Sequence, residues 1–461
     1  MSKVSSVTVA KFGGTSLKNY QSMVRCANIV IEEPSVKVVV LSASAGVTNL
    51  LVDLTERGLS EAIASTLIDN IKTIQLDISA SLFEQNQIEQ NRVNGYVLNL
   101  IHELEYASQM LREQFSLKLV DEILSFGERF SSYLFTEIMT ELLSNADDKP
   151  QLIRFDARRI IKTDSRFGHA RPDLTAIKQQ SQLSLNLPEC LYITQGFVGE
   201  DSFGNTTTLG RGGSDFSAAL IAEAINADKL QIWTDVAGIY SSDPRFVTKA
   251  KPIKTLSFNE AAELATFGAK VLHPATLLPA IRSKIDVFVG SSLEPAAGGT
   301  HLTTKPSTSG VRAIALRENQ TLVTLSSPNM LLASGFLARV FAILAKYELS
   351  VDLITTSEIS VALTFDNING VSEGILPQEC ITELEDFCAV SIEGELSLVA
   401  VIGNHNPDHE TISSTELLFK SLGDYQIRMI CHGASRHNVC FLVKQSIAKD
   451  VVTNIHDQIF G

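Results

Sequence analysis

An apolar, β-branched run at residues 7–10 is followed at once by Lys-Phe-Gly-Gly-Thr-Ser at residues 11–16. A strand that ends in a lysine, two glycines and a hydroxyl-rich helix start is typical of a phosphate-binding turn. The glycines let backbone N–H groups approach an anion, and the helix N-terminus adds the positive end of its dipole. The stretch lacks the Gly-Lys-Ser/Thr of a P-loop. Taken alone, it fits a ligand-free strand-to-helix turn equally well.

Composition narrows the class of protein. A chain of 461 residues with 44% apolar and 20% charged residues should form two or three globular domains. The net charge is −14 and no Lys/Arg cluster occurs, which argues against nucleic-acid binding. The N-terminus resembles no signal peptide and no apolar run reaches membrane-spanning length, so we expect a cytoplasmic protein without a membrane partner. None of the six cysteines has zinc-ligand spacing, which favours buried thiols in a reducing compartment.

The chain divides into a larger first region and a smaller second one. Up to about residue 293, buried strand-like runs at 36–41, 191–194, 231–234 and 287–289 alternate with helical segments. The proline-free stretch between Pro34 and Pro150 predicts a helical lobe attached to this sheet. A Pro/Gly-rich break at 294–299 marks a linker. We therefore expect an α/β catalytic domain at 1–295, with a parallel or mixed sheet covered on both faces.

The second region contains two copies of one small α+β unit, expected at 312–390 and 396–461. The repeat is set by aligning residues 350–354 with residues 426–430, each at the start of a strand-like run. Two copies are too few for a solenoid, so a paired module is the better interpretation.

Four further segments in the first region carry chemistry. The small and hydroxyl residues at 42–48 follow a buried strand and leave room for a ligand, although a tight turn explains them as well. Residues 210–215 (Gly-Arg-Gly-Gly-Ser-Asp) surround Arg211 with glycines, so that its planar fork can grip a carboxylate, while Asp215 can serve a magnesium-nucleotide site or orient a lysine.

The remaining two segments are less specific. The loop from Thr234 to Arg245 offers an Asp, a Tyr and an Arg for a nucleotide, or is only a surface Asp-Pro turn. Glu128, in Phe-Gly-Glu at 126–128, sits in an apolar helical setting, where a solvated helix face is the default interpretation.

Together these segments, with residues 267–274 (Phe-Gly-Ala-Lys-Val-Leu-His-Pro), resemble an aspartate kinase of the monofunctional, lysine-sensitive type. The resemblance covers almost the whole chain. It implies the amino-acid-kinase fold, a mainly parallel sheet covered by helices with a helical lobe, followed by two ferredoxin-like ACT domains. The implied reaction transfers the γ-phosphoryl group of ATP to the β-carboxylate of L-aspartate, the first step of lysine, threonine and methionine biosynthesis. ATP and Mg²⁺ are the implied cofactors, without a metal site built by the protein alone.

The resemblance also implies residue roles. The reaction needs no general base because a carboxylate is already ionised, so positioning and positive charge are the requirement. The expected catalytic residues are Lys11, Arg211 and Asp215, and the expected aspartate ligands are Thr48, Glu128, Arg211 and Ser214. The expected nucleotide side consists of Lys11, Gly13, Gly14, Thr234, Asp235, Tyr240, Arg245, Lys270 and Val271.

Feedback inhibition by L-lysine is expected in the first ACT copy, which would also pair between subunits to give at least a homodimer. The candidate lysine ligands are Met330, Phe336, Leu337, Ser350, Val351, Asp352, Ser357 and Glu358. Asp352 or Glu358 would face the side-chain ammonium, whereas Arg428 at the aligned position prevents the second copy from binding lysine in this way. Leu332 and Ala333 stand where related enzymes of this type tend to be polar.

Two alternatives remain open. Glutamate, acetylglutamate and uridylate kinases share the sheet and the glycine turns, but not the doubled C-terminal module or the Gly-Arg-Gly-Gly-Ser-Asp sequence. A catalytically silent ACT sensor of amino acids would be expected to lose Lys11, Arg211 or Asp215, and all three are present.

Overall fold

The computed structural model describes most of the chain as two compact units. The described residues are 6–82, 86–147, 149–187, 189–267, 274–304, 310–330, 334–366, 376–405, 414–423 and 425–461. The first unit comprises residues 1–239 and 271–304, and the second comprises 240–270 and 305–461. Residues 240–270, which fall inside the expected catalytic domain 1–295, therefore belong with the C-terminal unit.

The first unit is built on a mainly parallel sheet with the strand order β3-β4-β2-β1-β7-β9-β10. All neighbouring strands are parallel except β10, which runs antiparallel to β9. The apolar runs predicted from the sequence form its centre, as expected for strands buried on both faces. The strands are β1 (Thr8–Phe12), β2 (Val36–Leu41), β3 (Gln151–Arg154), β4 (Cys190–Gln195), β7 (Lys229–Thr234), β9 (Asp286–Ser291) and β10 (Gly299–Thr303), with a separate hairpin of β5 (Val198–Glu200) and β6 (Thr206–Thr208).

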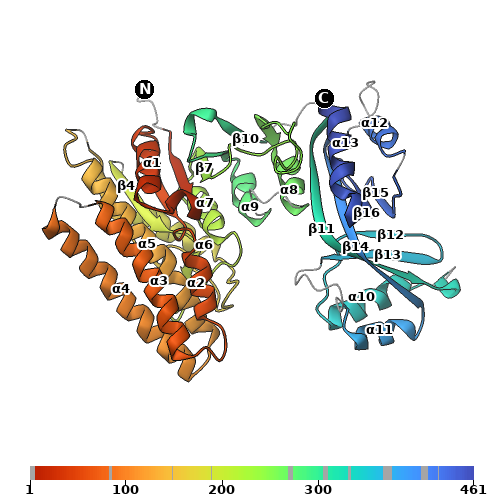
Figure 1. Ribbon diagram of the computed structural model, residues 1–461, viewed down its shortest axis with the longest axis horizontal. Coiled ribbons are helices and arrows are strands. Elements are labelled where there is room, and N and C mark those ends of the chain that lie inside the picture. Colours follow the sequence, from red (N-terminus) through yellow and green to blue (C-terminus); the bar gives the residue numbers. More distant parts are fainter. Residues whose placement is uncertain are drawn as a thin grey trace. The chain divides into compact units, whose positions relative to one another are not determined.

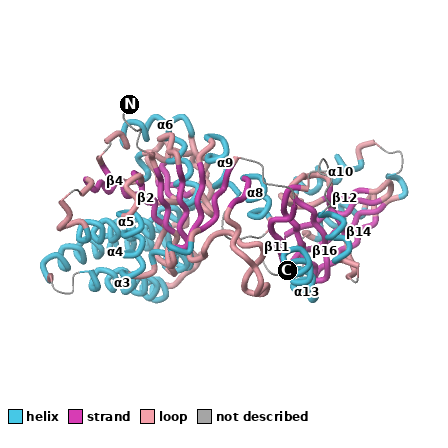
Figure 2. The backbone as a smooth tube through the Cα atoms, turned by 90° about the horizontal axis from the view of Figure 1, so that it is seen from above, coloured by secondary structure: helices cyan, strands magenta, loops and turns pink. Residues whose placement is uncertain are grey.

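Helices cover the sheet, and three long ones form the predicted lobe (Figures 1 and 2). One core cluster joins Phe12 and Leu41 of the sheet to α1 and to the lobe helices, where Phe130 and Phe135 are fully buried. The helices of this unit are α1 (Tyr20–Ile31), α2 (Val47–Leu54), α3 (Glu61–Leu82), α4 (Gln87–Glu113), α5 (Leu117–Leu142), α6 (Leu174–Ser184), α7 (Gly213–Ala224) and α9 (Pro274–Ser283).

The second unit contains one antiparallel sheet with the order β12-β13-β11-β14-β16-β15. Two long central strands pair with each other along most of their length. The predicted fold class, an α/β domain with a mainly parallel sheet followed by α+β modules, is confirmed. The elements are β11 (Gly310–Ser326), α10 (Phe336–Lys346), β12 (Ile354–Thr356), β13 (Ser360–Asp366), α11 (Gln378–Glu385), β14 (Ala389–Asn404), α12 (Ser414–Ser421), β15 (Met429–His432), β16 (Asn438–Lys444) and α13 (Ala448–Phe460).

The two modules share their central strands instead of following one another along the chain. Val323 and Leu325, late in β11, lie in a core with α10 and α11, whereas Ile314, early in β11, lies in a core with α12 and α13. The second module therefore takes its edge strand from residues that precede the whole first module. The early part of β11 thus packs with the second module although it precedes the first module in the sequence.

The segment 240–270 packs on the second module. Val247 is buried in the core of that module, and the Ser241 hydroxyl lies 2.8 Å from Nε2 of His456 on α13. β8 (Thr255–Ser257) leads into α8 (Phe258–Thr266), which begins with a capping box between Ser257 and Glu260.

Candidate active site

The predicted chemical segments meet because their strands are parallel neighbours. Phe12 of β1 is in register with Leu41 of β2 on one side and with Trp233 of β7 on the other. The residues that follow these three strands therefore emerge at one edge of the sheet, where ligands bind in open α/β folds.

Lys11 and Asp215 form an ion pair at this edge. The Lys11 Nζ atom lies 2.5 Å from Asp215 Oδ1, and the two side chains are 10% and 15% exposed. Lys11 is the penultimate residue of β1, and Asp215 lies in the first turn of α7. The sequence prediction that Asp215 orients a lysine agrees with this geometry.

Glu128 is buried beside that pair. It is 5% exposed, and burial raises the pKa of its carboxyl to about 8. The Ala43 backbone, Lys11 and the Ser214 hydroxyl each lower this pKa, but less than burial raises it. The default interpretation of a solvated helix face is therefore wrong for Glu128, because α5 turns this residue inward.

Glycines at three positions allow the segments around the site to pack closely. A Cβ atom on Gly14 would lie 2.9 Å from the Ala43 carbonyl oxygen, and one on Gly127 would lie 2.6 Å from the Ala43 Cβ. A Cβ on Gly196 would lie 2.6 Å from the Ser214 Cβ. These approaches bring the turns after β1, β2 and β4 against α5 and α7.

The Arg211 turn, residues 208–213, carries an exposed arginine between two left-handed glycines. Gly210 has φ +75° and Gly212 has φ +73°, conformations that other residues adopt only with strain. Gly212 also caps α7, so Ser214 and Asp215 follow in its first turn. The structure thus places Arg211, Ser214 and Asp215 on one turn, as the sequence predicts, while Thr48 is exposed in the first turn of α2.

One predicted phosphate donor has another partner. The Gly13 amide donates a hydrogen bond of 3.0 Å to the Trp233 carbonyl. This bond holds β1 against β7. The amide that we predicted to bind phosphate is therefore already hydrogen-bonded within the protein. A Cβ on Gly13 would lie in ordinary contact distance, 3.7 Å, of Lys11 Nζ, so the turn could accommodate it.

The predicted nucleotide residues are distributed over both units. Thr234 ends β7, and Ser292 connects it to the first turn by donating to Ser16 Oγ at 2.6 Å and to the Thr234 carbonyl at 3.1 Å. Asp235 is exposed next to Thr234. Tyr240 and Arg245 belong to the second unit, where the Arg245 guanidinium is paired with Asp243. Lys270 and Val271 lie outside the described residues.

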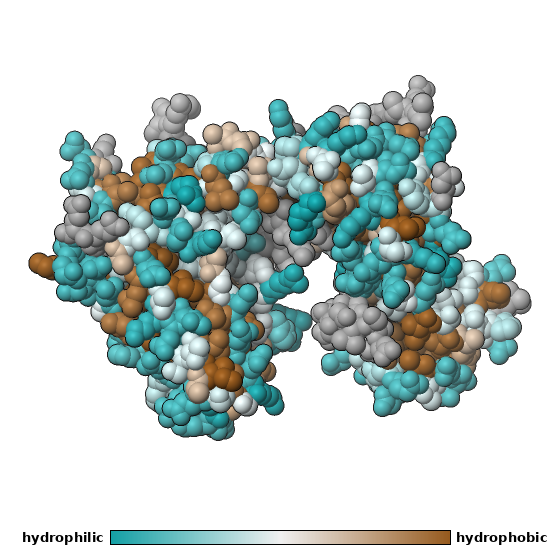
Figure 3. Space-filling model, in the orientation of Figure 1, coloured by the Kyte–Doolittle hydropathy of each residue, from teal (hydrophilic) through white to brown (hydrophobic). Residues whose placement is uncertain are grey.

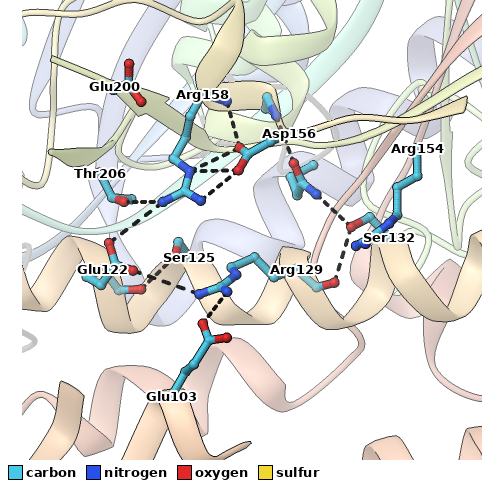
Figure 4. A network of polar contacts seen from close by, with 12 residues as sticks. Glu103, Glu122, Ser125, Arg129, Ser132, Arg154, Asp156, Arg158, Glu200 and Thr206 are labelled. Carbon is cyan, nitrogen blue, oxygen red and sulfur yellow. Dashed lines mark hydrogen bonds and ion pairs between the residues drawn. The ribbon is translucent and has the colours of Figure 1, made fainter. Parts of the chain in front are cut away.

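Helix α5 is anchored by a polar network that the sequence did not reveal (Figure 4). Arg158 donates to Thr206 Oγ1 at 2.8 Å and pairs with Asp156 at 2.7 Å, and it lies 4.0 Å from Glu122 of α5. Arg129, next to Glu128, pairs with Glu103 of α4 at 2.5 Å. The helix that carries Glu128 is thus tied to both the lobe and the sheet side.

Three more residues near the site were missed. Ser131 donates to the Ser42 carbonyl at 2.7 Å, and Ser217 accepts the amide of Phe197, which has φ +67°. Such a conformation costs about 1–3 kcal/mol and often marks a functional turn. The third is Asp121, a carboxylate buried on α5. A pattern available in the sequence was the i, i+7 spacing of Asp121 and Glu128, which places both on the same face of one helix.

The predicted lysine-binding residues gather on the first module only in part. Met330, Phe336 and Val351 pack against its core, and Leu337 is exposed on α10. Ser350 and Glu358 are exposed, and the Ser357 hydroxyl lies 2.7 Å from that of Ser360 in the β12–β13 turn.

Asp352 already has a cationic neighbour. Arg317 Nη1 lies 3.6 Å from Asp352 Oδ1 and lowers the pKa of the carboxyl, which burial raises. A ligand ammonium that approaches Asp352 would have to compete with Arg317. Leu332 and Ala333 lie outside the described residues.

The sequence predicts no metal site built by the protein alone. Among the residues that the structure describes, no group of three His, Cys, Asp or Glu side chains converges to hold an ion. Mg²⁺ is commonly held by one or two carboxylates together with substrate phosphates and water. Asp215 and Asp235 are carboxylates suited to such shared coordination of a nucleotide-bound ion.

We predict that Gly127→Ala will damage this site more than the fold. The new Cβ would meet Ala43 at 2.6 Å and push α5 from the turn after β2. Overpacking costs about 1–3 kcal/mol of stability, and displacement of a reacting group by about 1 Å can cost about 100-fold in rate. Steady-state kinetics should show kcat/KM for the phosphoryl acceptor falling at least about tenfold.

Gly95→Ala on α4 is the matched control, since a Cβ at Gly95 meets nothing within 4 Å. It should leave kcat/KM unchanged. Adding Ala43→Gly to Gly127→Ala should restore part of the activity. Equal losses in both alanine variants would contradict a close-approach role for Gly127.

Comparisons with known proteins agree with this geometry. The amino acid kinase family matches residues 6–291, and an ACT domain matches residues 399–459. Lysine-sensitive aspartokinase 3 of Escherichia coli (strain K12) is 48% identical over 99% of this chain and 100% of its own. Aspartokinase 3, chloroplastic, of Arabidopsis thaliana is 32% identical over 98% of this chain and 81% of its own.

Two solved structures of E. coli aspartokinase III are similar over 99% of this chain and 100% of theirs, at 47% identity. The complex with aspartate and ADP (R-state) has a TM-score of 0.85, and the complex with lysine and aspartate (T-state) has 0.81. Within the described part of this chain, no helix combines the length and apolar character needed to cross a bilayer. By sequence, fold and the arrangement of its site, this chain belongs to the amino acid kinase family and, within it, to the aspartokinases.

Proposed function

We propose that this chain transfers the γ-phosphoryl group of ATP to the β-carboxylate of L-aspartate, giving 4-phospho-L-aspartate. One observation carries the proposal: a buried carboxylate, Glu128, lies beside the Lys11–Asp215 pair. Such a site offers a cation for a transferring phosphoryl group and an anion for an ammonium in adjacent places. The near full-length similarity to aspartokinases supports aspartate over glutamate, acetylglutamate or a silent sensor role.

The chemical difficulty is to bring two anions together. Lys11 supplies a full positive charge at the end of β1, and Asp215 holds its side chain in place. The Gly14 amide, at the start of the following turn, adds a backbone donor for the phosphates. Preorganised positive groups in a partly buried site stabilise the charge of the transferring group without reorganising water.

Acceptor recognition would be divided between α5 and the Arg211 turn. Glu128 would pair with the α-ammonium of aspartate, and Arg211 would grip a carboxylate with its planar fork. Ser214 and Thr48 would donate hydrogen bonds. An acid without the amine would leave the buried Glu128 carboxylate without this cationic partner and should bind poorly.

The nucleotide would lie toward the residues that follow β7. Thr234 supports this because Ser292 connects its carbonyl with Ser16 in the first turn, and Asp235 follows it in the sequence. Tyr240, Arg245, Lys270 and Val271 are assigned to the nucleotide by family resemblance alone. Mg²⁺ bound to the phosphates would neutralise part of their charge, with Asp215 or Asp235 as its protein ligand.

We further propose that L-lysine inhibits through the first ACT module and that two subunits pair there. Glu358, exposed in the β12–β13 turn, is available for the lysine side-chain ammonium, and Asp352 would join it by exchanging Arg317 for the ligand. Apolar side chains gather on this module near α10 (Figure 3), where Leu337 is 38% and Phe341 is 41% exposed. Lysine would act by binding an inactive arrangement more tightly than the active one.

A direct assay tests the reaction. With Mg²⁺ and ATP, the purified chain should produce an acyl phosphate from L-aspartate, trapped as the hydroxamate, and little from glutamate or acetylglutamate. Added L-lysine should lower the rate. An acceptor other than aspartate that is consumed faster would refute the proposed substrate, and a full rate in saturating lysine would refute the proposed inhibitor.

We predict that Arg211→Ala will act on the acceptor and not on the nucleotide. A lost bidentate contact to a carboxylate corresponds to at least about 100-fold in kcat/KM for aspartate, since each of its two charged hydrogen bonds contributes about 1.5–3 kcal/mol. The KM for ATP should change less than about twofold. Arg211→Lys should recover little, because an ammonium cannot form the fork. A collapse of ATP binding instead would reassign Arg211 to the nucleotide.

We predict that kcat/KM for aspartate will rise with pH because Glu128 must be ionised to hold an ammonium. Its pKa is raised to about 8, so the ionised fraction grows by about an order of magnitude between about pH 6.5 and pH 8. Glu128→Gln should show low activity and no such rise. Glu137→Gln, on the same helix but paired with Arg92, should keep the wild-type profile. An unchanged pH profile in Glu128→Gln would exclude Glu128 as the titrating group.

A further inference from the structure

Asp121 is a fully buried carboxylate in the first unit that the chemistry above does not use. It lies near the start of α5 and is 0% exposed. Both of its oxygens accept hydrogen bonds from outside the helix. The Thr208 amide donates to Oδ2 at 2.8 Å and the Thr208 hydroxyl to Oδ1 at 2.9 Å, while the Gly168 amide lies 2.9 and 3.0 Å from the two oxygens.

These donors belong to the support of the Arg211 turn. Thr208 ends β6 and is the first residue of that turn, and its carbonyl accepts the Ala170 amide at 2.8 Å. A Cβ on Gly210 would lie 3.2 Å from the Gly168 carbonyl oxygen, so the loop around Gly168 lies directly against the turn. Asp121 thus ties together the two backbone segments between which the arginine-bearing turn is held.

The same helix carries Glu128 seven residues later. Seven residues are close to two helical turns, so the two carboxylates lie on one face of α5, about 10 Å apart along its axis. Both are buried because this face is turned toward the sheet edge. Asp121 holds the turn that presents Arg211, and Glu128 faces Ser214 in the first turn of α7, directly after it.

The network in Figure 4 makes this helix a rigid support. Arg158 lies beside Glu122, the residue after Asp121, and also donates to Thr206 at the start of β6. β6 is therefore bound at both ends, by Arg158 at Thr206 and by Asp121 at Thr208. Sites built on rigid elements hold their geometry better than sites on free loops.

We propose that Asp121 is a positioning residue for acceptor recognition, which fixes the Arg211 turn relative to Glu128 so that α5 sets the length of amino acid that fits between them. The inference rests on the proposed function, because it takes Arg211 and Glu128 as the two groups that hold the acceptor. Asp121 itself touches neither acceptor nor nucleotide and moves no proton. Its carboxylate is suited to this role because three converging donors, two of them backbone amides, need acceptors that an apolar side chain lacks.

Asp121→Asn tests the proposal with little change in size. The amide NH₂ would face an N–H or O–H donor, so at least one of the present bonds is lost. We expect the KM for aspartate to rise at least tenfold, with the KM for ATP within twofold of wild type. The ratio of kcat/KM for aspartate to that for glutamate should fall, because a mobile Arg211 turn discriminates less between acceptors of different length.

Two further variants separate positioning from general destabilisation. Asp201→Asn is the matched control: Asp201 is 3% exposed and binds the Phe203 amide, the Asn205 amide and side chain, and the Ser165 hydroxyl. It should lower the melting temperature as Asp121→Asn does, without changing the acceptor ratio. Thr208→Val removes only the hydroxyl bond to Asp121, so it should raise the KM for aspartate by a smaller factor. If Asp121→Asn does not fold, the result with Thr208→Val tests the positioning role of Asp121.

Hydrogen exchange supplies a readout that does not depend on the acceptor. In Asp121→Asn, or in Thr208→Val if that protein is used, the amides of residues 208–213 should exchange faster while those of β1 and β7 stay protected. Unchanged exchange of the turn, or equal rises in the KM for aspartate and for ATP, would overturn the positioning role. Inactivity of the wild-type chain toward aspartate would instead refute the proposed function. The hydrogen-exchange result would then still test whether Asp121 holds the Arg211 turn.

Discussion

Burial of the Glu128 carboxylate is the constraint on which the rest of the site depends. A buried anion is costly unless positive or donating groups face it, and here the Ala43 backbone, the Ser214 hydroxyl and Lys11 do so. These groups come from three separate segments, so they offset part of that cost only when the strands after which they lie are correctly paired. The absence of a Cβ at Gly127 is what permits α5 to come close enough to the Ala43 turn.

Helix α5 is more than a member of the helical lobe. Its inward face carries Asp121, which binds Thr208 at the start of the Arg211 turn, and Glu128 and Ser131, which contact the turn after β2. Its other side is held by the Arg129–Glu103 pair and the Arg92–Glu137 pair to α4. The lobe thus acts as a scaffold for the site, which accounts for a long helix without proline in a region that carries little chemistry of its own.

In the second unit, shared strands make the two modules dependent on each other. The same shift along the sequence relates Asp352 to Arg428 and Arg317 to Glu393, and in each module the two residues form an ion pair with the charges exchanged. The aligned positions are equivalent in structure, since the Asp352 amide donates to Thr364 and the Arg428 amide donates to Leu442 before the corresponding strands. This inversion agrees with the expectation that the second module does not bind lysine as the first would.

The sequence by itself determined the parallel sheet, the helical lobe, the doubled module and the residue types of the site, because buried strands, helix caps and glycine turns leave local patterns. It did not determine that the Gly13 amide serves β7, that Arg317 faces Asp352, or that residues 240–270 belong with the C-terminal unit. Nor could it assign the first half of β11 to the second module. These features depend on which distant segments become neighbours, and only tertiary packing decides which donors, charges and cores are already satisfied before a ligand arrives.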